Sequence, residues 1–417
     1  DLAALGDMDV RFDRASDVDP EPLVTTPGDS IVARVEAIID GTEVIDVRMV
    51  WVLDKNPVFG DVLRQAPNGP RDVNVVTTDP TQWTGEVMGN QWFGRDRWSF
   101  DLPDEDFLYP GDVLRYRFLA TDSDARVSEL PIDDTGFLSG VNYDPRFTVR
   151  ALPSLFVAQN ELRQPRDLFV METGRAADEL ALQVSLGTLG FEQGVDYDLF
   201  GVRNPDSQRS LGIGSAGAHG ASLEQIAGYR NLFLDFGQRD RYLLSDGSGI
   251  DDNNPGPDLG LLIDWHEEPG ERAAIHFGVD LTTALASEST LGAFYLQNVL
   301  GVEIGVNDIR EVQRSNLYER VSGVSPYFFW DYLLVPSCGL DLGFDGLRPF
   351  ISSFGVQGFY RDYVGGPDPD GWAGVVHERE VLGDPTIDMT FSYTPLLLQT
   401  EMEKDILPTI LGPRTTA

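Results

Sequence analysis

Cysteine is almost absent from this sequence: Cys338 is the one thiol in 417 residues, so no disulfide can form within the chain. Lysine is nearly as scarce, with two residues, and 68 acidic side chains outnumber 31 basic ones to give a formal net charge of −37. Uninterrupted apolar runs of the roughly 18 residues that a membrane helix requires are missing too. We therefore expect neither a disulfide framework nor a transmembrane segment, and a surface this negative repels nucleic acid and anionic lipid.

The excess of acid has three explanations. Acidic, lysine-poor surfaces resist aggregation and suit salty surroundings. Clustered Asp and Asn oxygens suit Ca²⁺, and a negative surface also suits docking to a basic protein. Solvation is the favoured explanation. We expect protein partners, a basic one among them, and no nucleic acid, whereas the oligomeric state is left open.

The first part of the chain has the pattern of an all-β domain. Residues 1–22 are Asp-rich and predict an N-terminal arm, and residues 23–152 predict an antiparallel β-sandwich of the immunoglobulin (Ig) or fibronectin type. Short segments that alternate apolar and polar residues, separated by Pro, Gly, Asn and Asp, are the basis: 29–37, 45–52, 83–88, 97–102 and 113–120. Residues 56–82 are too polar and too rich in Pro and Gly for sandwich strands, so a long loop is predicted there. Residues 153–165 are expected to form a linker.

One phrase in this region carries a resemblance. Tyr109-Pro-Gly-Asp112, the segment Ala120-Thr-Asp-Ser123 and Val127-Ser-Glu-Leu-Pro131 follow one another in that order. Together they resemble the final strands of Ig-like domains in bacterial secreted multidomain proteins. The resemblance implies a spacer or adhesion module and an exported protein, with an extracellular, cell-surface or periplasmic location.

From residue 166 to 395 the pattern alternates between strand and helix. Apolar strand segments are 166–171, 196–200, 231–236 and 272–277, and amphipathic helical segments are 175–189, 222–229, 258–266 and 289–300. This rhythm predicts a doubly wound parallel sheet of the flavodoxin class. Residues 327–393 are β-rich again and predict strands added to an edge of that sheet, while 396–417 predict a C-terminal tail.

A second resemblance covers this α/β domain. Ala221–Tyr229, Tyr242–Gly247, Pro257–Trp265 and Phe277–Leu281 occur in an order that resembles an uncharacterised module of large bacterial secreted proteins, related to class I glutamine amidotransferases and flavodoxin-like folds. The resemblance implies fold and location and no assigned activity.

The amidotransferase resemblance can be tested at one turn of the sequence. That superfamily places its nucleophilic cysteine on a sharp strand-to-helix elbow, and the matching turn here is Ile275–Leu281. Its elbow position falls on Val279, and valine cannot attack a carbonyl group. His377-Glu-Arg-Glu380 also lacks the H-x-E spacing of the family's other catalytic residues. We therefore expect a degenerate site with no catalytic residue and no cofactor.

Cys338 supplies the alternative. Together with His219 it resembles the Cys/His pair of gingipain-type cysteine peptidases, so a cysteine-dependent hydrolase of the peptidase or amidotransferase type is the rival hypothesis. The two positions are 119 residues apart, more than that family leads us to expect, and buried, inert cysteines are common in protein cores. The interpretation as a core cysteine is favoured.

The loop from Ser245 to Asp258 is the candidate metal site. Its carboxylates are Asp246, Asp251, Asp252 and Asp258, which could hold Ca²⁺ although their spacing is not that of an EF-hand. A solvated polar turn is the favoured alternative. The sequence as a whole thus predicts a two-domain, exported, non-catalytic structural or interaction protein that serves in adhesion, in scaffolding or as an accessory subunit.

Overall fold

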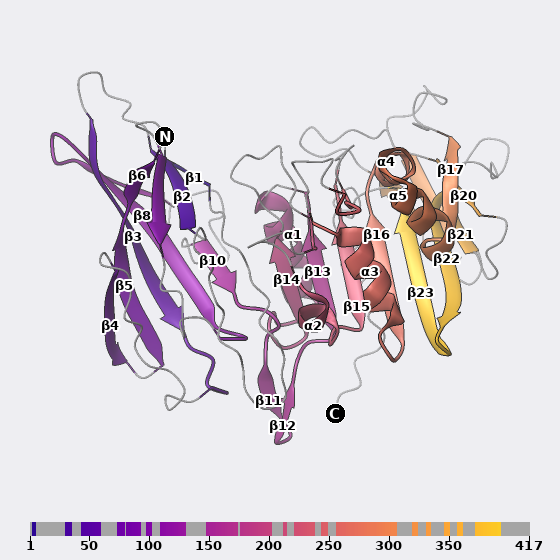
Figure 1. Cartoon of the computed structure of the whole chain (residues 1–417), viewed down its shortest axis with the longest axis horizontal. Coiled ribbons are helices and arrows are strands. Elements are labelled where there is room, and N and C mark those ends of the chain that lie inside the picture. Colours follow the sequence, from indigo (N-terminus) through magenta and orange to yellow (C-terminus); the bar gives the residue numbers. More distant parts are fainter. Residues whose placement is uncertain are drawn as a thin grey trace. The chain divides into compact units, whose positions relative to one another are not determined.

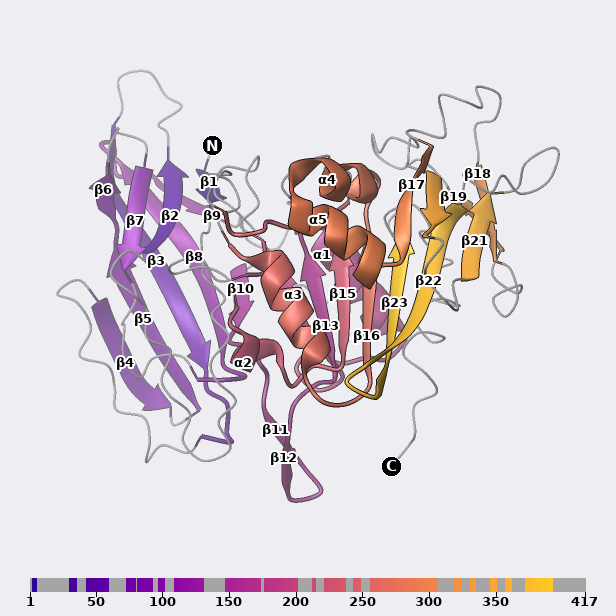
Figure 2. The same cartoon turned by 45° about the vertical axis from the view of Figure 1, so that its right-hand side comes forward.

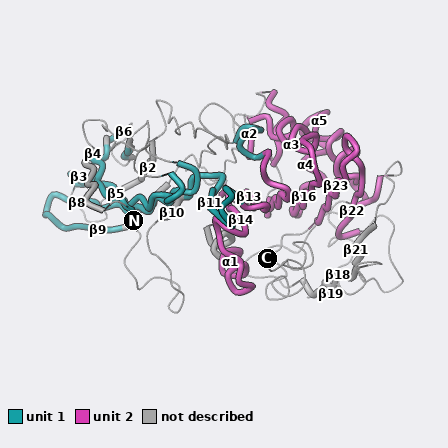
Figure 3. Tube along the Cα trace, turned by 90° about the horizontal axis from the view of Figure 1, so that it is seen from below, with its two compact units in different colours: residues 1–164, 203–209, 217–226 teal, residues 165–202, 210–216, 227–417 magenta. Residues whose placement is uncertain are grey.

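The computed structural model describes a chain built mostly of strands, with a few helices (Figures 1 and 2). The described residues are 2–5, 30–35, 43–59, 73–79, 81–92, 97–101, 109–130, 147–173, 176–201, 212–214, 221–237, 243–248, 256–306, 319–323, 331–334, 346–350, 357–361 and 372–392. They divide into two compact units (Figure 3). Unit 1 comprises residues 1–164, 203–209 and 217–226, and unit 2 comprises 165–202, 210–216 and 227–417.

The described part of unit 1 contains two large antiparallel sheets and one two-stranded sheet. The four-stranded sheet has the order β1-β2-β7-β6 and the larger one the order β10-β8-β3-β5-β4, with β9 beside β8. The strands of the first are β1 (Leu2–Leu5), β2 (Ser30–Val35), β6 (Asn90–Trp92) and β7 (Arg97–Asp101). Those of the second are β3 (Val44–Asp54), β4 (Val73–Asp79), β5 (Gln82–Met88), β8 (Val113–Asp122), β9 (Val127–Leu130) and β10 (Phe147–Arg150).

A single apolar core joins these two sheets. Strand β3 alternates buried and half-buried residues because every second side chain points to the same face, and β8 does so over most of its length. The buried face of β3 holds Trp51, and Phe118 of β8 contacts Phe100 of β7 with ring centroids 5.0 Å apart. The larger and the smaller sheet therefore bury their apolar faces against the same set of side chains.

The motif residues of the Ig-like phrase have local structural roles. The carboxylate of Asp112 is fully buried and accepts hydrogen bonds from the backbone N–H groups of Asn56 (2.6 Å) and Tyr109 (3.0 Å). Asn56 in turn donates through its side-chain amide to the carbonyl oxygens of Pro110 and Leu155. The Pro-Gly-Asp turn is therefore held to the chain that follows β3 by a buried polar network.

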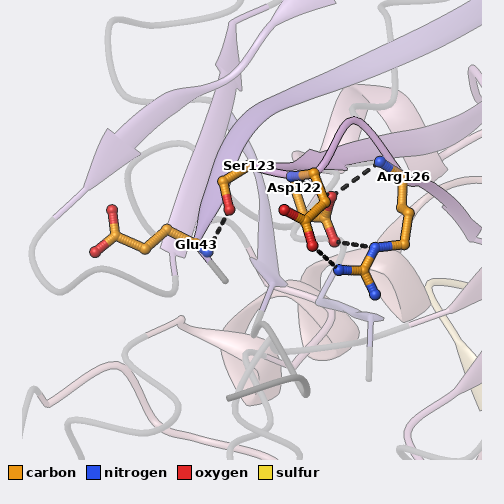
Figure 4. Close-up of polar contacts among 5 residues, drawn as sticks. Glu43, Asp122, Ser123 and Arg126 are labelled. Atoms are coloured by element: carbon orange, nitrogen blue, oxygen red, sulfur yellow. Dashed lines mark hydrogen bonds and ion pairs between the residues drawn. The ribbon is translucent and has the colours of Figure 1, made fainter. Parts of the chain in front are cut away.

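The turn after β8 is closed in a similar way (Figure 4). Asp122 accepts the backbone N–H of Arg126 at 2.9 Å and pairs with its guanidinium at 3.1 Å. Ser123 and Glu43 exchange two hydrogen bonds: the Ser123 N–H donates to the Glu43 carbonyl, and the Glu43 N–H donates to the Ser123 hydroxyl. The Thr-Asp-Ser phrase thus fixes the β8–β9 turn and ties it to the chain just before β3.

Unit 2 is built on a mixed sheet of eleven strands. Its parallel part has the order β14-β13-β15-β16-β23, and antiparallel strands continue it as β22-β21-β18-β19. The parallel strands are β13 (Asp167–Met171), β14 (Tyr197–Gly201), β15 (Asn231–Asp235), β16 (Arg272–Phe277) and β23 (Asp384–Phe391). The others are β17 (Val302–Val306), β18 (Glu319–Gly323), β19 (Asp331–Leu334), β20 (Gly346–Pro349), β21 (Gln357–Arg361) and β22 (Trp372–Val381), with β20 pairing β17 and β22.

Helices lie on both faces of this sheet. Helix α1 (Ala176–Thr188) covers one face, and α3 (Asp258–Glu267), α4 (Leu281–Glu288), α5 (Thr290–Phe294) and the π-helix η1 (Tyr295–Val299) cover the other (Figures 2 and 3). The short α2 (Leu223–Ile226) belongs to unit 1. The coarse expectation of a multidomain β and α/β chain is confirmed, including the parallel sheet extended by later strands.

One sequence expectation needs correction, and the structure adds detail to another. Residues 56–82 were expected to hold no strand, but β4 pairs antiparallel with β5 at the edge of the sheet, and five of its seven residues are β-branched. The expected linker 153–165 contains a β-hairpin of β11 (Phe156–Ala158) and β12 (Glu161–Arg163). Within the described part of the chain, no helix has the length and apolar character required to cross a membrane. Most of the predicted arm (1–22) and all of the predicted tail (396–417) lie outside the described residues.

Candidate functional site

The carboxyl ends of the parallel strands are the first place to look for a site, because doubly wound sheets bind ligands where the strand order reverses. In this sheet the reversal lies between β13 and β15. Glu172 follows β13 and Asp235 ends β15, and both are buried. The N–H of Glu172 donates to the Asp235 carbonyl at 2.8 Å, and the Asp235 carboxylate accepts the N–H of Gly237 at 2.9 Å. Two buried acidic residues of neighbouring strands therefore lie at this edge, joined through their backbones, and the carboxylate of Asp235 also binds a backbone N–H group.

The elbow after β16 lies on the same edge. Val279 stands between β16 and α4, its side chain is 4% exposed, and its N–H donates to the Gly237 carbonyl at 3.1 Å. The N–H of Gly278 donates to the carbonyl of Phe391, at the end of β23. The position predicted for a degenerate nucleophile is thus a buried apolar side chain in a strand-to-helix turn.

The acidic loop before α3 is organised around Asp258. This buried carboxylate accepts the N–H groups of Gly214 and Ser245, so it connects two loops to the first turn of the helix. Asp246 is half-buried, and hydrogen bonds from Ser248 lower the pKa of its carboxyl group. Asp251 and Asp252 lie outside the described residues. Among the described residues no group of three His, Cys, Asp or Glu side chains has a metal-binding arrangement, so calcium stays a prediction.

A cluster absent from our sequence-based candidates lies on the face covered by α3–α5 and η1. Strand register places Asp388 of β23 between Ala274 of β16 and His377 of β22. Arg379 donates to the Asp388 carboxylate at 2.9 Å, and His266 of α3 approaches its other oxygen to 3.1 Å without the alignment of a hydrogen bond. We call Asp388, Arg379, His266, His276 and Tyr295 the buried polar layer.

Charge in this layer is set by burial and by neighbours. Desolvation by itself would raise the pKa of Asp388, but His266 and then Arg379 outweigh it and hold that pKa below its usual range. His276 is fully buried, which lowers its pKa to about 4, and its Nε2 lies 3.0 Å from the hydroxyl of Tyr295. Burial also raises the pKa of Tyr295 well above its usual value. His276 and Tyr295 are therefore neutral at pH 7, beside an ionised Asp388.

The buried polar layer connects helices to the sheet. His266 comes from α3 and Tyr295 from η1, and the Nδ1 of His377 lies 2.7 Å from the carbonyl of Val299 at the end of η1. A histidine next to an aspartate has the composition of a general base and its orienting partner. At 3% and 0% exposure, however, His266 and Asp388 are closed to substrate, so the contacts hold helices in place.

The signal for this layer was present in the sequence. Thr386, Asp388 and Thr390 alternate with apolar residues along β23, a pattern typical of a strand with one face in water. Sequence reasoning assigns such polar residues to the surface. Only the coverage of this face by helices turns them into a buried layer.

The remaining sequence candidates, Cys338 and His219, lie outside the described residues. The cysteine-dependent hydrolase therefore stays a hypothesis that rests on the sequence alone.

No family model and no curated protein matches this chain. Among solved structures, one described as a cytoplasmic protein from Salmonella typhimurium is 13% identical and has a TM-score of 0.32. The match covers 57% of this chain and 92% of that one. A likeness at this TM-score carries no argument about fold or activity. The description of that neighbour nevertheless contradicts the expected extracellular, cell-surface or periplasmic location, which is withdrawn.

Proposed function

We propose that this protein is a non-catalytic interaction protein, a scaffold or an accessory subunit, in which an Ig-like sandwich precedes a flavodoxin-like module related to class I glutamine amidotransferases. The observation that carries the proposal is Val279. A buried valine occupies the strand-to-helix elbow where the related enzymes place a nucleophile, and it packs at 4% exposure.

The sheet order supports the assignment of the module. Counted along the chain, the five parallel strands stand in the order 2-1-3-4-5, which is the flavodoxin-like order. In unit 1, two antiparallel sheets around one core, with a Pro-Gly-Asp turn tied by Asp112, support an Ig-like sandwich.

The polar groups of unit 2 favour a structural over a catalytic role. Asp258 is occupied by backbone N–H groups of two loops, and Asp388 lies between Arg379 and His266 beneath helices. Groups held this way position loops and helices instead of reaching a substrate. The net charge of −37 favours a protein partner with a basic surface.

The test measures whether the protein hydrolyses amide substrates and whether Cys338 is unusually reactive in the native state. The protein and a Cys338→Ala variant are incubated with glutamine and with a set of fluorogenic peptide amides, and alkylation of Cys338 by iodoacetamide is followed by mass spectrometry. We expect no turnover above buffer and alkylation no faster than in the urea-unfolded chain. Turnover that disappears in Cys338→Ala, with a thiol that reacts faster in the native protein, would establish the hydrolase and overturn the proposal.

A further inference from the structure

The hairpin of β11 and β12 stands apart from the two sheets of unit 1. It is a two-stranded sheet by itself within the described part of the chain, closed by Gln159 and Asn160. Both turn residues have positive φ, +54° and +65°, as a two-residue type I′ hairpin requires. An isolated two-stranded ribbon is marginally stable in water, so a further contact would stabilise this one.

One face of this ribbon is apolar and exposed. Val157 and Leu162 are direct cross-strand partners, and their exposed fractions are 61% and 49%. The other face carries Glu161 and Arg163, which form an exposed ion pair at 3.2 Å. The three residues of β12 thus present acid, leucine and base in sequence.

The outer edge of β12 is ready to pair. In a two-residue hairpin the pair that closes the turn is hydrogen-bonded, and hydrogen-bonded pairs alternate with pairs whose backbone groups point outward. Ala158 and Glu161 close the turn, so Leu162 directs its N–H and C=O away from the ribbon. β12 contains neither proline nor lysine, the residues that most often protect a strand edge.

We propose that β12 pairs antiparallel with β12 of a second copy of this chain, about a two-fold axis through Leu162. In this register Leu162 faces the partner's Leu162 and exchanges two backbone hydrogen bonds with it. Glu161 then faces the partner's Arg163, and Arg163 faces the partner's Glu161. A two-fold contact must be self-complementary, and the order acid, leucine, base has this property. The apolar faces of the two hairpins join into one row of four side chains.

Charge favours this location for the contact. Two copies at −37 each repel one another, but residues 147–166 hold three arginines and one acidic residue. The hairpin is therefore the place where the copies approach with least repulsion. Because salt screens the remaining repulsion, the dimer is expected to strengthen as ionic strength rises towards 0.15 M, where the Debye length is about 8 Å.

The test uses charge reversal and sedimentation velocity on the full chain over a range of concentration and salt. Glu161→Arg places arginine opposite arginine, and Arg163→Glu places glutamate opposite glutamate, so each variant alone dimerises about tenfold more weakly or worse. An equimolar mixture of the two restores opposite charges at every position and recovers the dimer as a heterodimer. The double variant Glu161→Arg, Arg163→Glu recovers a homodimer.

Asp124→Arg is the matched control, because Asp124 is exposed, pairs with a nearby arginine and lies in another turn of unit 1. It leaves dimerisation unchanged. A wild-type chain that stays monomeric at every concentration and salt overturns the proposal, as does a mixture that fails to recover the dimer lost in the single variants. This inference rests on the proposed function and adds self-association to it, beside any partner with a basic surface. A monomer would leave the non-catalytic assignment standing, and hydrolysis by Cys338 would leave the dimer standing.

Discussion

Acidification from pH 7 to pH 4 is expected to change the contributions of two buried groups of unit 2 to the free energy of unfolding in opposite directions. Burial lowers the pKa of His276 to about 4 from an ordinary value of 6.5. Below pH 6.5 His276 is protonated in the unfolded chain but stays neutral in the folded chain. The free energy of unfolding therefore decreases as the pH is lowered from 6.5 to about 4.

Asp167 acts in the opposite direction. Desolvation, partly offset by a hydrogen bond from Asn231, raises the pKa of its carboxyl group from 3.8 to about 6. The folded chain therefore binds this proton more tightly than the unfolded chain. Its contribution to stability is fully present below pH 3.8 and is lost as the pH rises through 6.

The contributions of His276 and Asp167 to the free energy of unfolding partly cancel at intermediate pH. Each shift of somewhat more than two units corresponds to about 3 kcal/mol when fully expressed. At pH 5, integration between the folded and unfolded pKa values gives a loss of about 2 kcal/mol from His276 and a gain of about 1 kcal/mol from Asp167, relative to pH 7. These two groups alone therefore change the stability of the wild type little over this interval.

Single substitutions separate the two contributions. Asp167→Asn mimics the protonated carboxyl group and keeps an acceptor for Asn231, so it is expected to stabilise the protein by up to about 3 kcal/mol at pH 7 and by almost nothing at pH 4. His276→Gln removes the acid loss while keeping a polar group near Tyr295. Urea unfolding followed by circular dichroism, with hydrogen exchange of peptides from β13 and β16 as a local measure, gives each difference from wild type against pH.

Asp264→Asn on the exposed side of α3 is the control for removing one negative charge. Its difference from wild type at each pH is compared with the difference measured for Asp167→Asn. The reasoning is refuted if the Asp167→Asn difference is equally flat between pH 7 and pH 4, or if it grows as the pH falls.

Three further predictions concern loops and turns, each measured by urea unfolding. Asp112→Ala leaves the N–H groups of Asn56 and Tyr109 without their carboxylate and is expected to cost about 2–3 kcal/mol, whereas a cost below 0.5 kcal/mol would contradict its anchoring role. Asp258→Ala removes the acceptor of two loop N–H groups and is expected to cost a similar amount, with faster hydrogen exchange in residues 243–248. Gly301 has a φ of +68°, and a Cβ added there would lie 2.6 Å from the ring of His377. Gly383 has a φ of +96°, but nothing lies within 4 Å of an added Cβ. Gly301→Ala is therefore expected to cost about 2 kcal/mol more than Gly383→Ala, and equal costs would show that a small shift relieves the contact.

Local pattern was sufficient where a residue's environment is decided by its neighbours in sequence. The alternation in 45–52 predicted β3, because every second side chain of a strand shares a face. The strand and helix segments after residue 166 predicted the parallel strands β13, β14, β15 and β16, whereas β23, also parallel, lies in the part expected to add strands to an edge. The strand-to-helix turn that the amidotransferase resemblance assigned to Ile275–Leu281 lies between β16 and α4, because a strand, a turn and a helix in immediate succession need no distant partner.

Strand pairing between distant segments could not be predicted from the local sequence pattern. The β4 strand was missed because it lies inside 56–82, which is polar and rich in Pro and Gly as a whole, although five of its own seven residues are β-branched. The hairpin in 153–165 was missed for a related reason, since Gln159 and Asn160 adopt the left-handed conformation without the glycine that usually marks such a turn.

The sequence by itself thus determined the strongly acidic composition and the kind of many elements, among them β3, the strands β13 to β16 and the helix α3. The tertiary structure decided which polar residues are internal. Asp388, Arg379 and His266 come from two strands and a helix, and the sheet register with the helix above it brings them together. Alternation reports that two faces of a strand differ, but only packing decides which face is covered, and hence whether a polar residue meets water or a partner.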